Sequence, residues 1–125
     1  MYLGYIVHIK DALNFYIHMD NLPSYVDRVI TSDNPYFYQD DGGELKYAYP
    51  YKCRLAGVKM PLDRKDLRQS TSAIRRLIDR MDGWVNVEVF RIDKYSRLVV
   101  DLIDNEGNSL KDELVATYSL TPYTD

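Results

Sequence analysis

The sequence predicts a mixed α+β fold with elements in the order β-β-β-α-β-β-α, and three observations indicate it. Several stretches alternate polar and apolar residues, which is typical of half-buried strands. An apolar stripe at helical spacing crosses residues 65–82, between the third and fourth strands. The length of 125 residues, with 46% hydrophobic and 28% charged residues, matches one globular domain, so we treat 1–125 as a single domain.

The first two strands are expected at 2–9 and 13–19, joined by a link at 10–12 that is short enough for a tight hairpin. Every other residue of the second strand is apolar, so one of its faces is expected in the core. Residues 20–43 are rich in residues that favour turns. We expect this insertion to be an elaborated loop, with room for a short strand or a packed lid, rather than a second domain.

A long third strand is expected over 44–58. Tyr47, Tyr49 and Tyr51 fall on one of its faces. Pro50 cannot donate a hydrogen bond to a neighbouring strand, so the strand is bulged or lies at a sheet edge there. Aromatic residues at this spacing can form a base-stacking platform, but they more often pack in a core or at a protein interface.

The second half of the chain supplies the remaining elements. The predicted helix over 65–82 ends at Gly83, because glycine readily adopts the left-handed conformation that closes a helix. Two further strands, 84–92 and 97–103, are joined by a short turn of polar and charged residues. A last helix begins near Ser109, a residue type that caps helix N-termini.

Charge and cysteine content limit the classes of function. The net charge of −3 and the pI of about 5.3 give no overall field that would draw the chain to nucleic acid or to an anionic membrane. Cys53 is the only cysteine, which excludes an internal disulfide and suits a reducing, intracellular compartment. His8 and His18 have no close ligand spacing, so no metal or other cofactor is expected. Signal-peptide and membrane-span patterns are absent, so no membrane partner is expected.

Three motifs resemble those of the staphylococcal nuclease-like (thermonuclease) family. They are CRLAGVKMP at 53–61, DKYSRLVVDLI at 93–103 and LKDELVATYSLTPY at 110–123, and the D-K-Y-x-R turn is the most specific. The resemblance covers about residues 5–123, apart from the 20–43 insertion. It implies a β-barrel with helices, an OB-like five-stranded barrel of the staphylococcal nuclease type.

The resemblance also implies that the catalytic parts of the family are missing here. The family cleaves phosphodiesters with a calcium ion held by carboxylates and a glutamate as general base. Leu13 and Lys59 occupy the positions of liganding aspartates, Met60 follows the second of these, and Leu62 replaces the glutamate. A lysine about 4 Å from a dication is repelled by about 2 kcal/mol even in water. We therefore expect no catalytic residues and no metal, as in a pseudo-nuclease.

The anion-holding parts of the family motif are retained. The matching residues are the phosphate-binding candidates Arg54, Arg97 and Lys59, and the nucleotide-stacking candidates Tyr95 and Tyr123. A phosphate can bind such a cationic pocket without a metal. The alternative is that the two arginines form ion pairs with acids such as Asp11 or Asp93.

Three hypotheses for function follow. The first is a catalytically inactive nuclease-like module that serves as a structural or protein-binding subunit of a larger assembly. The second is metal-independent binding of nucleic acid or nucleotide phosphate through the retained arginines. The third is an active phosphodiesterase with a relocated metal site. Small members of the resembled family occur in large DNA viruses, so the expected location is the cytoplasm, the nucleus or a virion.

Overall fold

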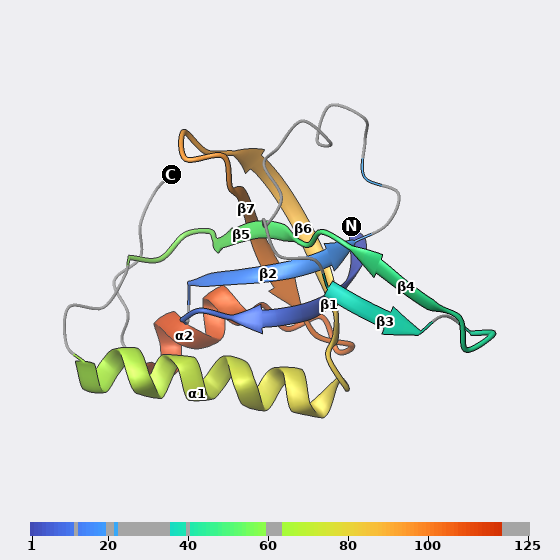
Figure 1. Cartoon of the computed structure of the whole chain (residues 1–125). Helices are drawn as coiled ribbons and strands as arrows, with labels where there is room; N and C mark the ends of the chain where they lie inside the picture. Colours follow the sequence, from blue (N-terminus) through green and yellow to red (C-terminus); the bar gives the residue numbers. More distant parts are fainter. Residues whose placement is uncertain (12, 20–21, 23–35, 40, 60–63, 119–125) are drawn as a thin grey trace.

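In the computed structural model the chain folds into a closed five-stranded β-barrel with two helices and a two-stranded ribbon beside it (Figure 1). The structure describes residues 1–11, 13–19, 22, 36–39, 41–59 and 64–118. Its elements are β1 (Tyr2–Ile9), β2 (Asn14–Met19), β3 (Tyr36–Gln39), β4 (Leu45–Ala48), β5 (Tyr51–Leu55), α1 (Arg64–Arg80), β6 (Trp84–Ile92), β7 (Leu98–Ile103) and α2 (Leu110–Tyr118).

The barrel strands lie in the order β1-β2-β5-β7-β6, and β6 pairs with β1 to close the ring. All neighbouring pairs are antiparallel except β5 and β7, which run parallel. Taken without the ribbon, the chain runs β1, β2, β5, α1, β6, β7, α2. The predicted order β-β-β-α-β-β-α and the OB-like barrel class are therefore confirmed.

The alternation of the sequence places the core inside the barrel. On β2, Phe15, Ile17 and Met19 are buried, whereas the residues between them are half-buried. Gly4 leaves no room for a side chain, because a Cβ there would lie 2.7 Å from Cγ2 of Ile17 and 2.8 Å from Cγ2 of Val87. This close approach across the barrel explains a glycine in the middle of a strand.

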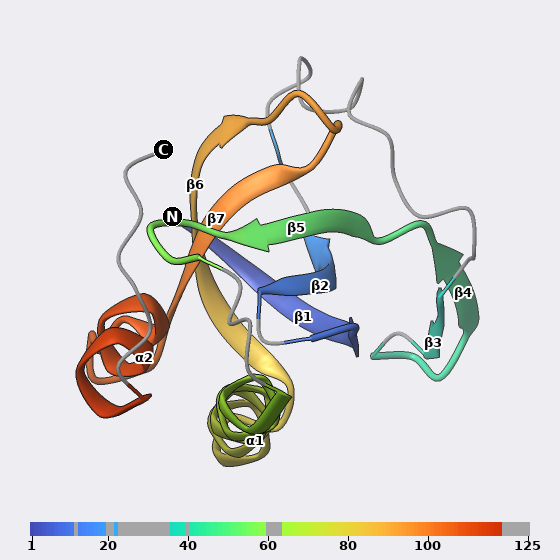
Figure 2. The same cartoon turned by 90° about the vertical axis from the view of Figure 1, so that its left-hand side faces the viewer.

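The prediction of one long strand over 44–58 is wrong, because the structure divides this stretch into two strands, β4 and β5. Pro50 lies between the two and has no N–H to continue a ladder. Strand β4 pairs with β3 instead of joining the barrel. The two form a ribbon that projects from the barrel (Figures 1 and 2). The short strand allowed for in the 20–43 insertion is β3, and residues 23–35 lie outside the described part of the chain.

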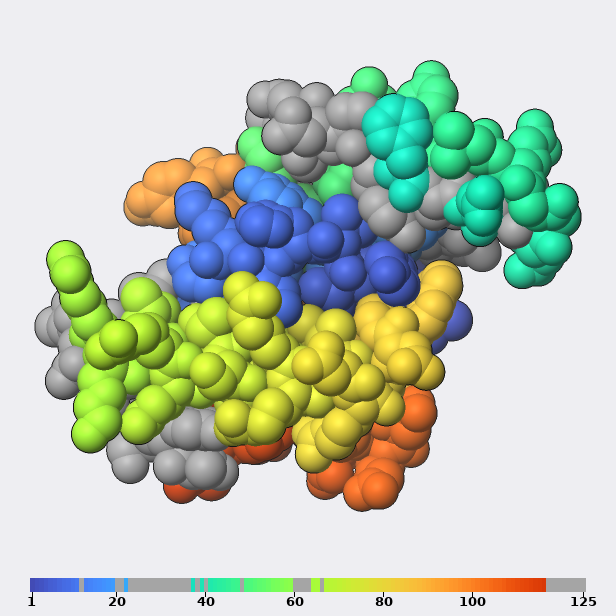
Figure 3. Space-filling view, turned by 60° about the horizontal axis from the view of Figure 1, so that its bottom comes forward, coloured from blue at the N-terminus to red at the C-terminus, as the bar shows by residue number. Residues whose placement is uncertain are grey.

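Helix α1 confirms the helix expected over 65–82 and ends as its sequence indicates. Gly83 has a φ of +86° and its N–H donates to the carbonyl of Ile78 at 3.0 Å. A Cβ at Gly83 would lie 2.6 Å from the ring of Tyr5. The space-filling view shows α1 lying across the molecule between the N-terminal strands and α2 (Figure 3).

Helix α2 is fixed to the barrel by a buried carboxylate. Ser109 caps the helix as expected, since its Oγ accepts from the N–H of Asp112 at 3.2 Å. Asp101 on β7 is 3% exposed and accepts hydrogen bonds from the Ser109 hydroxyl and from the N–H of Lys111. The N-terminus of α2 is thus tied to the middle of a barrel strand.

Candidate functional site

The hairpin between β1 and β2 holds one of the positions where the family resemblance expects a metal ligand. Leu13 is 1% exposed and belongs to the core. Asp11 closes the turn, because its Oδ1 accepts from the N–H groups of Leu13 at 2.8 Å and Asn14 at 3.0 Å. The carboxylate of Asp11 therefore stabilises the backbone of the hairpin.

Arg97 is held by two partners on different elements. Its Nε donates to Oδ2 of Asp93 at 2.9 Å, and its Nη1 donates to Oδ1 of Asn14 at 3.0 Å. Partial burial raises the pKa of Asp93, but hydrogen bonds from the N–H groups of Arg97 and Tyr95 and from the Arg97 guanidinium outweigh this and leave the pKa lowered. Arg97 thus makes the ion pair with Asp93 that the sequence offered as an alternative.

A pocket of about 250 Å³ opens beside Arg97. Its lining residues come from the β1–β2 hairpin, β2, β5 and the β6–β7 turn, and they are Lys10, Asn14, Phe15, Tyr16, Lys52, Cys53, Tyr95 and Arg97. Among these described residues there are three cations and no carboxylate. The strand register explains the grouping, because Tyr16 lies opposite Lys52, and Cys53 lies opposite Leu98 in the next strand.

Two of the three cations have no counter-charge among the residues that the structure describes. Within the described residues, the amino groups of Lys10 and Lys52 make no hydrogen bond or ion pair, whereas Arg97 is paired with Asp93. The ring of Tyr95 is 65% exposed, and the Arg97 guanidinium and the Lys94 ammonium each lie 5.2 Å from its centroid. The pocket is therefore positively charged and bordered by an accessible aromatic ring.

The pocket thiol is not a nucleophile. Cys53 is buried, and burial raises the pKa of its thiol far above the usual range. The protonated thiol is the poorly reactive form, so Cys53 contributes packing rather than chemistry.

The other residues that the sequence proposed for this site lie elsewhere. Nη2 of Arg54 approaches the carbonyl of Val58 at 3.4 Å, and Lys59 is exposed. Neither side chain lines the pocket. Met60, Leu62 and Tyr123 lie outside the described residues. Of the expected set, the structure brings Arg97 and Tyr95 together in the pocket.

Sequence reasoning missed Lys10, Lys52 and Tyr16. Lys52 and Tyr16 stand on neighbouring barrel strands, opposite each other in the register. Their alternation with buried residues marks them as outward-facing, but alternation within one strand does not reveal its partner. Only the pairing of β2 with β5 and of β5 with β7 brings them to Arg97.

The β3–β4 ribbon carries an exposed aromatic face. Phe37 and Tyr47 lie opposite each other in the register, with ring centroids 6.2 Å apart, and Tyr49 packs edge-on against Tyr47. These rings are 61%, 64% and 46% exposed, respectively, and Leu45 on the same strand is 68% exposed. The ribbon therefore presents three exposed aromatic rings in contact with one another, together with the exposed Leu45, to solvent. We call these four residues the ribbon face.

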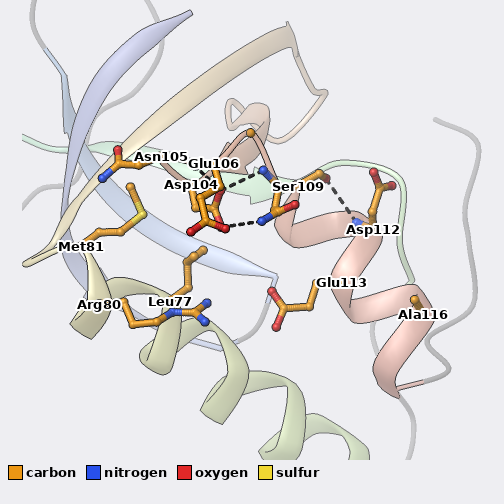
Figure 4. A pocket seen from close by; sticks show the side chains of 12 residues that line it. Leu77, Arg80, Met81, Asp104, Asn105, Glu106, Ser109, Asp112, Glu113 and Ala116 are labelled. Atoms are coloured by element: carbon orange, nitrogen blue, oxygen red, sulfur yellow. Dashed lines mark hydrogen bonds between the residues drawn. The ribbon is translucent and has the colours of Figure 1, made fainter.

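A larger hollow of about 670 Å³ lies between the end of α1, the β7–α2 loop and α2 (Figure 4). It combines apolar side chains with four acids and one arginine, namely Leu77, Met81, Ala116, Asp104, Glu106, Asp112, Glu113 and Arg80. The carboxylate of Asp104 stabilises the β7–α2 loop. Its Oδ1 accepts hydrogen bonds from the N–H groups of Asn108 and Glu106, both at 2.9 Å, and these bonds lower the pKa of Asp104. The described part of the chain offers no group of three acids, histidines or cysteines placed to hold a metal.

Comparison with known proteins finds likeness in structure alone. No family model and no curated protein matches the sequence. Extended Tudor domain TD3 from mouse TDRD1, solved in complex with a MILI peptide containing dimethylarginine 45, has a TM-score of 0.62 and 11% identity, over 98% of this chain and 93% of that chain. Extended-Tudor 9 of Drosophila melanogaster has a TM-score of 0.53 and 13% identity, over 94% of this chain and 95% of that chain.

At these identities the likeness establishes the fold alone. The chain has an OB-like barrel with helices of the kind found in extended Tudor domains. Membership of the thermonuclease family, which the sequence motifs suggested, does not follow from it. In the described residues, no helix is long and apolar enough to cross a membrane.

Proposed function

We propose that the chain is a non-catalytic, nuclease-like module that binds a protein partner as a subunit of a larger assembly. The ribbon face is the observation that carries this proposal. A two-stranded ribbon is marginally stable by itself, and apolar patches on soluble proteins commonly mark interaction sites. Fully burying one large, fully exposed apolar side chain contributes roughly 1.5–3 kcal/mol, and each side chain of the ribbon face, being about half exposed, can contribute about half of that.

The state of the former catalytic positions supports a module without nuclease chemistry. Leu13 is a core residue, and Lys59 adds a positive charge where the family places a calcium ligand. Aliphatic and ammonium groups cannot serve as ligands for a hard dication, which requires oxygen donors. With added calcium, we expect no digestion of DNA or RNA, and digestion that stops on chelation would contradict the proposal.

The structural comparison supports protein recognition as the class of function. The mouse extended Tudor domain has the same fold and was solved with a bound peptide. At 11% identity the likeness supplies no ligand for this chain, so the partner's sequence has to come from experiment. The tyrosine-rich ribbon fits a protein interface, where aromatic rings give large contact area at low entropic cost.

The test compares two triple variants by quantitative co-purification from the natural source. One is Phe37→Ser/Tyr47→Ser/Tyr49→Ser, which removes the rings of the ribbon face. Its matched control is Leu3→Ser/Phe90→Ser/Ile92→Ser, which removes exposed apolar side chains from the barrel. We expect the same partner to accompany the wild type and the control and to be lost from the ribbon variant. Retention of that partner by a folded ribbon variant would contradict the proposal.

A second candidate function is metal-independent binding of a nucleic-acid or nucleotide phosphate through Arg54, Arg97 and Lys59. The cationic pocket favours phosphate binding, since Arg97 forms part of it. Arg54 and Lys59 do not line that pocket, which moves the candidate site towards Lys10 and Lys52.

A further inference from the structure

We infer that the pocket formed by Lys10, Lys52 and Arg97 recognises a single phosphate group on a phosphorylated side chain of the protein partner. This inference rests on the proposed protein-binding function and specifies the chemistry of the partner.

The charge in the pocket matches a phosphate monoester. Three cations line it, and Asp93 compensates one of them through its ion pair with Arg97. The remaining excess is close to two positive charges, from Lys10 and Lys52. A phosphorylated side chain carries about −1.5 to −2 charges at neutral pH. Binding would thus neutralise the pocket without requiring a metal ion.

The pocket also supplies the required donors. A phosphate monoester offers three strong acceptor oxygens, and each lysine ammonium has three N–H groups to donate. Arg97 uses Nε and Nη1 within the protein, and its Nη2 has no partner in the described part of the chain. Charge-assisted bonds of this kind are about twice as strong as neutral ones.

A single phosphate fits the molecule better than a polyanion. Proteins that bind single-stranded nucleic acid carry a basic groove that follows the backbone over several nucleotides. Here the pocket of about 250 Å³ gathers three cations, on a chain whose net charge is −3. The larger hollow at the helices is lined by four acids against one arginine. A long polyanion would gain little beyond the first phosphate.

The pocket lies close to the ribbon face along the chain. Lys52 follows Tyr49 by three positions in the sequence, so their Cα atoms are at most about 11 Å apart. An extended peptide covers that distance with three or four residues. One extended partner segment is therefore long enough to contact Tyr49 of the ribbon face and to place a phosphorylated residue beside Lys52.

The test is a titration with phenyl phosphate, followed by amide NMR shifts of the full chain. We expect saturable shifts at Lys10, Asn14, Lys52 and Arg97, and binding at least tenfold weaker in Lys10→Glu/Lys52→Glu. The control Arg68→Glu/Arg75→Glu changes net charge equally on the exposed face of α1 and should bind like wild type. Shifts elsewhere, or equal loss in both variants, would overturn the inference.

A second arm separates the possible sources of phosphate. Fluorescence anisotropy would compare a short phosphotyrosine peptide, its unphosphorylated twin and single-stranded oligothymidine. We expect only the phosphorylated peptide to compete with phenyl phosphate in the low-millimolar range or tighter. Oligothymidine that binds more than tenfold tighter through the same lysines would overturn the protein source in favour of nucleic acid.

The ribbon variant Phe37→Ser/Tyr47→Ser/Tyr49→Ser keeps the two proposals distinguishable. It should bind phenyl phosphate like the wild type while losing the partner. If the partner depends on the ribbon but phenyl phosphate does not bind the pocket, this inference fails and the proposed function stands.

Discussion

The barrel and the β3–β4 ribbon both contain alternating sequence, yet the barrel buries its apolar side chains and the ribbon exposes them. In the barrel, inward-facing residues such as Ile17, Leu55 and Val87 are fully buried. In the ribbon, Phe37 and Tyr47 remain more than half exposed. Five strands close on themselves, whereas two strands cannot cover their own face. Closure of the barrel therefore buries its apolar side chains, whereas the ribbon leaves Phe37 and Tyr47 available for the contact proposed above.

The largest effect should come from the barrel. Replacing Leu55 by alanine removes a fully buried side chain from the core. We expect the free energy of unfolding to fall by about 2–5 kcal/mol, from lost burial and the cavity left behind. Urea denaturation measures it. A loss below about 1 kcal/mol would mean that the barrel core is packed much more loosely than the structure indicates.

The next effect tests how α2 is attached. Asp101→Ala leaves the Ser109 hydroxyl and the N–H of Lys111 without their acceptor. Leaving a fully buried polar group unpaired typically costs about 1–3 kcal/mol, and these two groups are part-buried, so we expect a total destabilisation of about 1–3 kcal/mol. The control is Asp112→Ala on the exposed side of α2, with an expected change within about 0.5 kcal/mol. Equal effects of the two substitutions would contradict the anchoring role of Asp101.

The sequence could predict the barrel strands and the helix ends, but not the elements that depend on pairing between distant strands. Alternation located the barrel strands, and Gly83 and Ser109 marked a helix end and a helix start, because these signals are local. The division at Pro50 was missed, since alternation runs on from β4 into β5 and only the pairing of β4 with β3 separates them. The Lys10–Lys52–Arg97 pocket was missed for the same reason: it depends on register between strands distant in sequence.

A smaller effect concerns pH. Hydrogen bonds and the Arg97 ion pair lower the pKa of Asp93 in the folded chain. A lowered carboxyl pKa contributes stability that is present above the unfolded pKa and is lost as pH falls through the folded pKa. We expect Asp93→Asn to flatten the decline of stability below about pH 4. Urea midpoints from pH 2 to 7 measure this, and an unchanged acid decline would contradict it.

The smallest effect should come from the ribbon of the free protein. Tyr47→Ser removes a largely exposed ring, so we expect the free energy of unfolding to change by no more than about 0.5 kcal/mol. The same substitution should weaken partner binding by about 2 kcal/mol or more if Tyr47 is an interface anchor. A large loss of stability without loss of partner would place Tyr47 in the fold rather than in the interface.

Site-specific photo-crosslinking in cells of the natural source can show directly whether a protein contacts the ribbon face. The photoreactive residue would be introduced as Tyr47→p-benzoylphenylalanine on the ribbon face and, as a control, as Phe90→p-benzoylphenylalanine on the barrel. We expect one discrete protein adduct at position 47 and none at position 90. Adducts to nucleic acid at position 47, or the same protein adduct at both positions, would contradict a protein partner on the ribbon face.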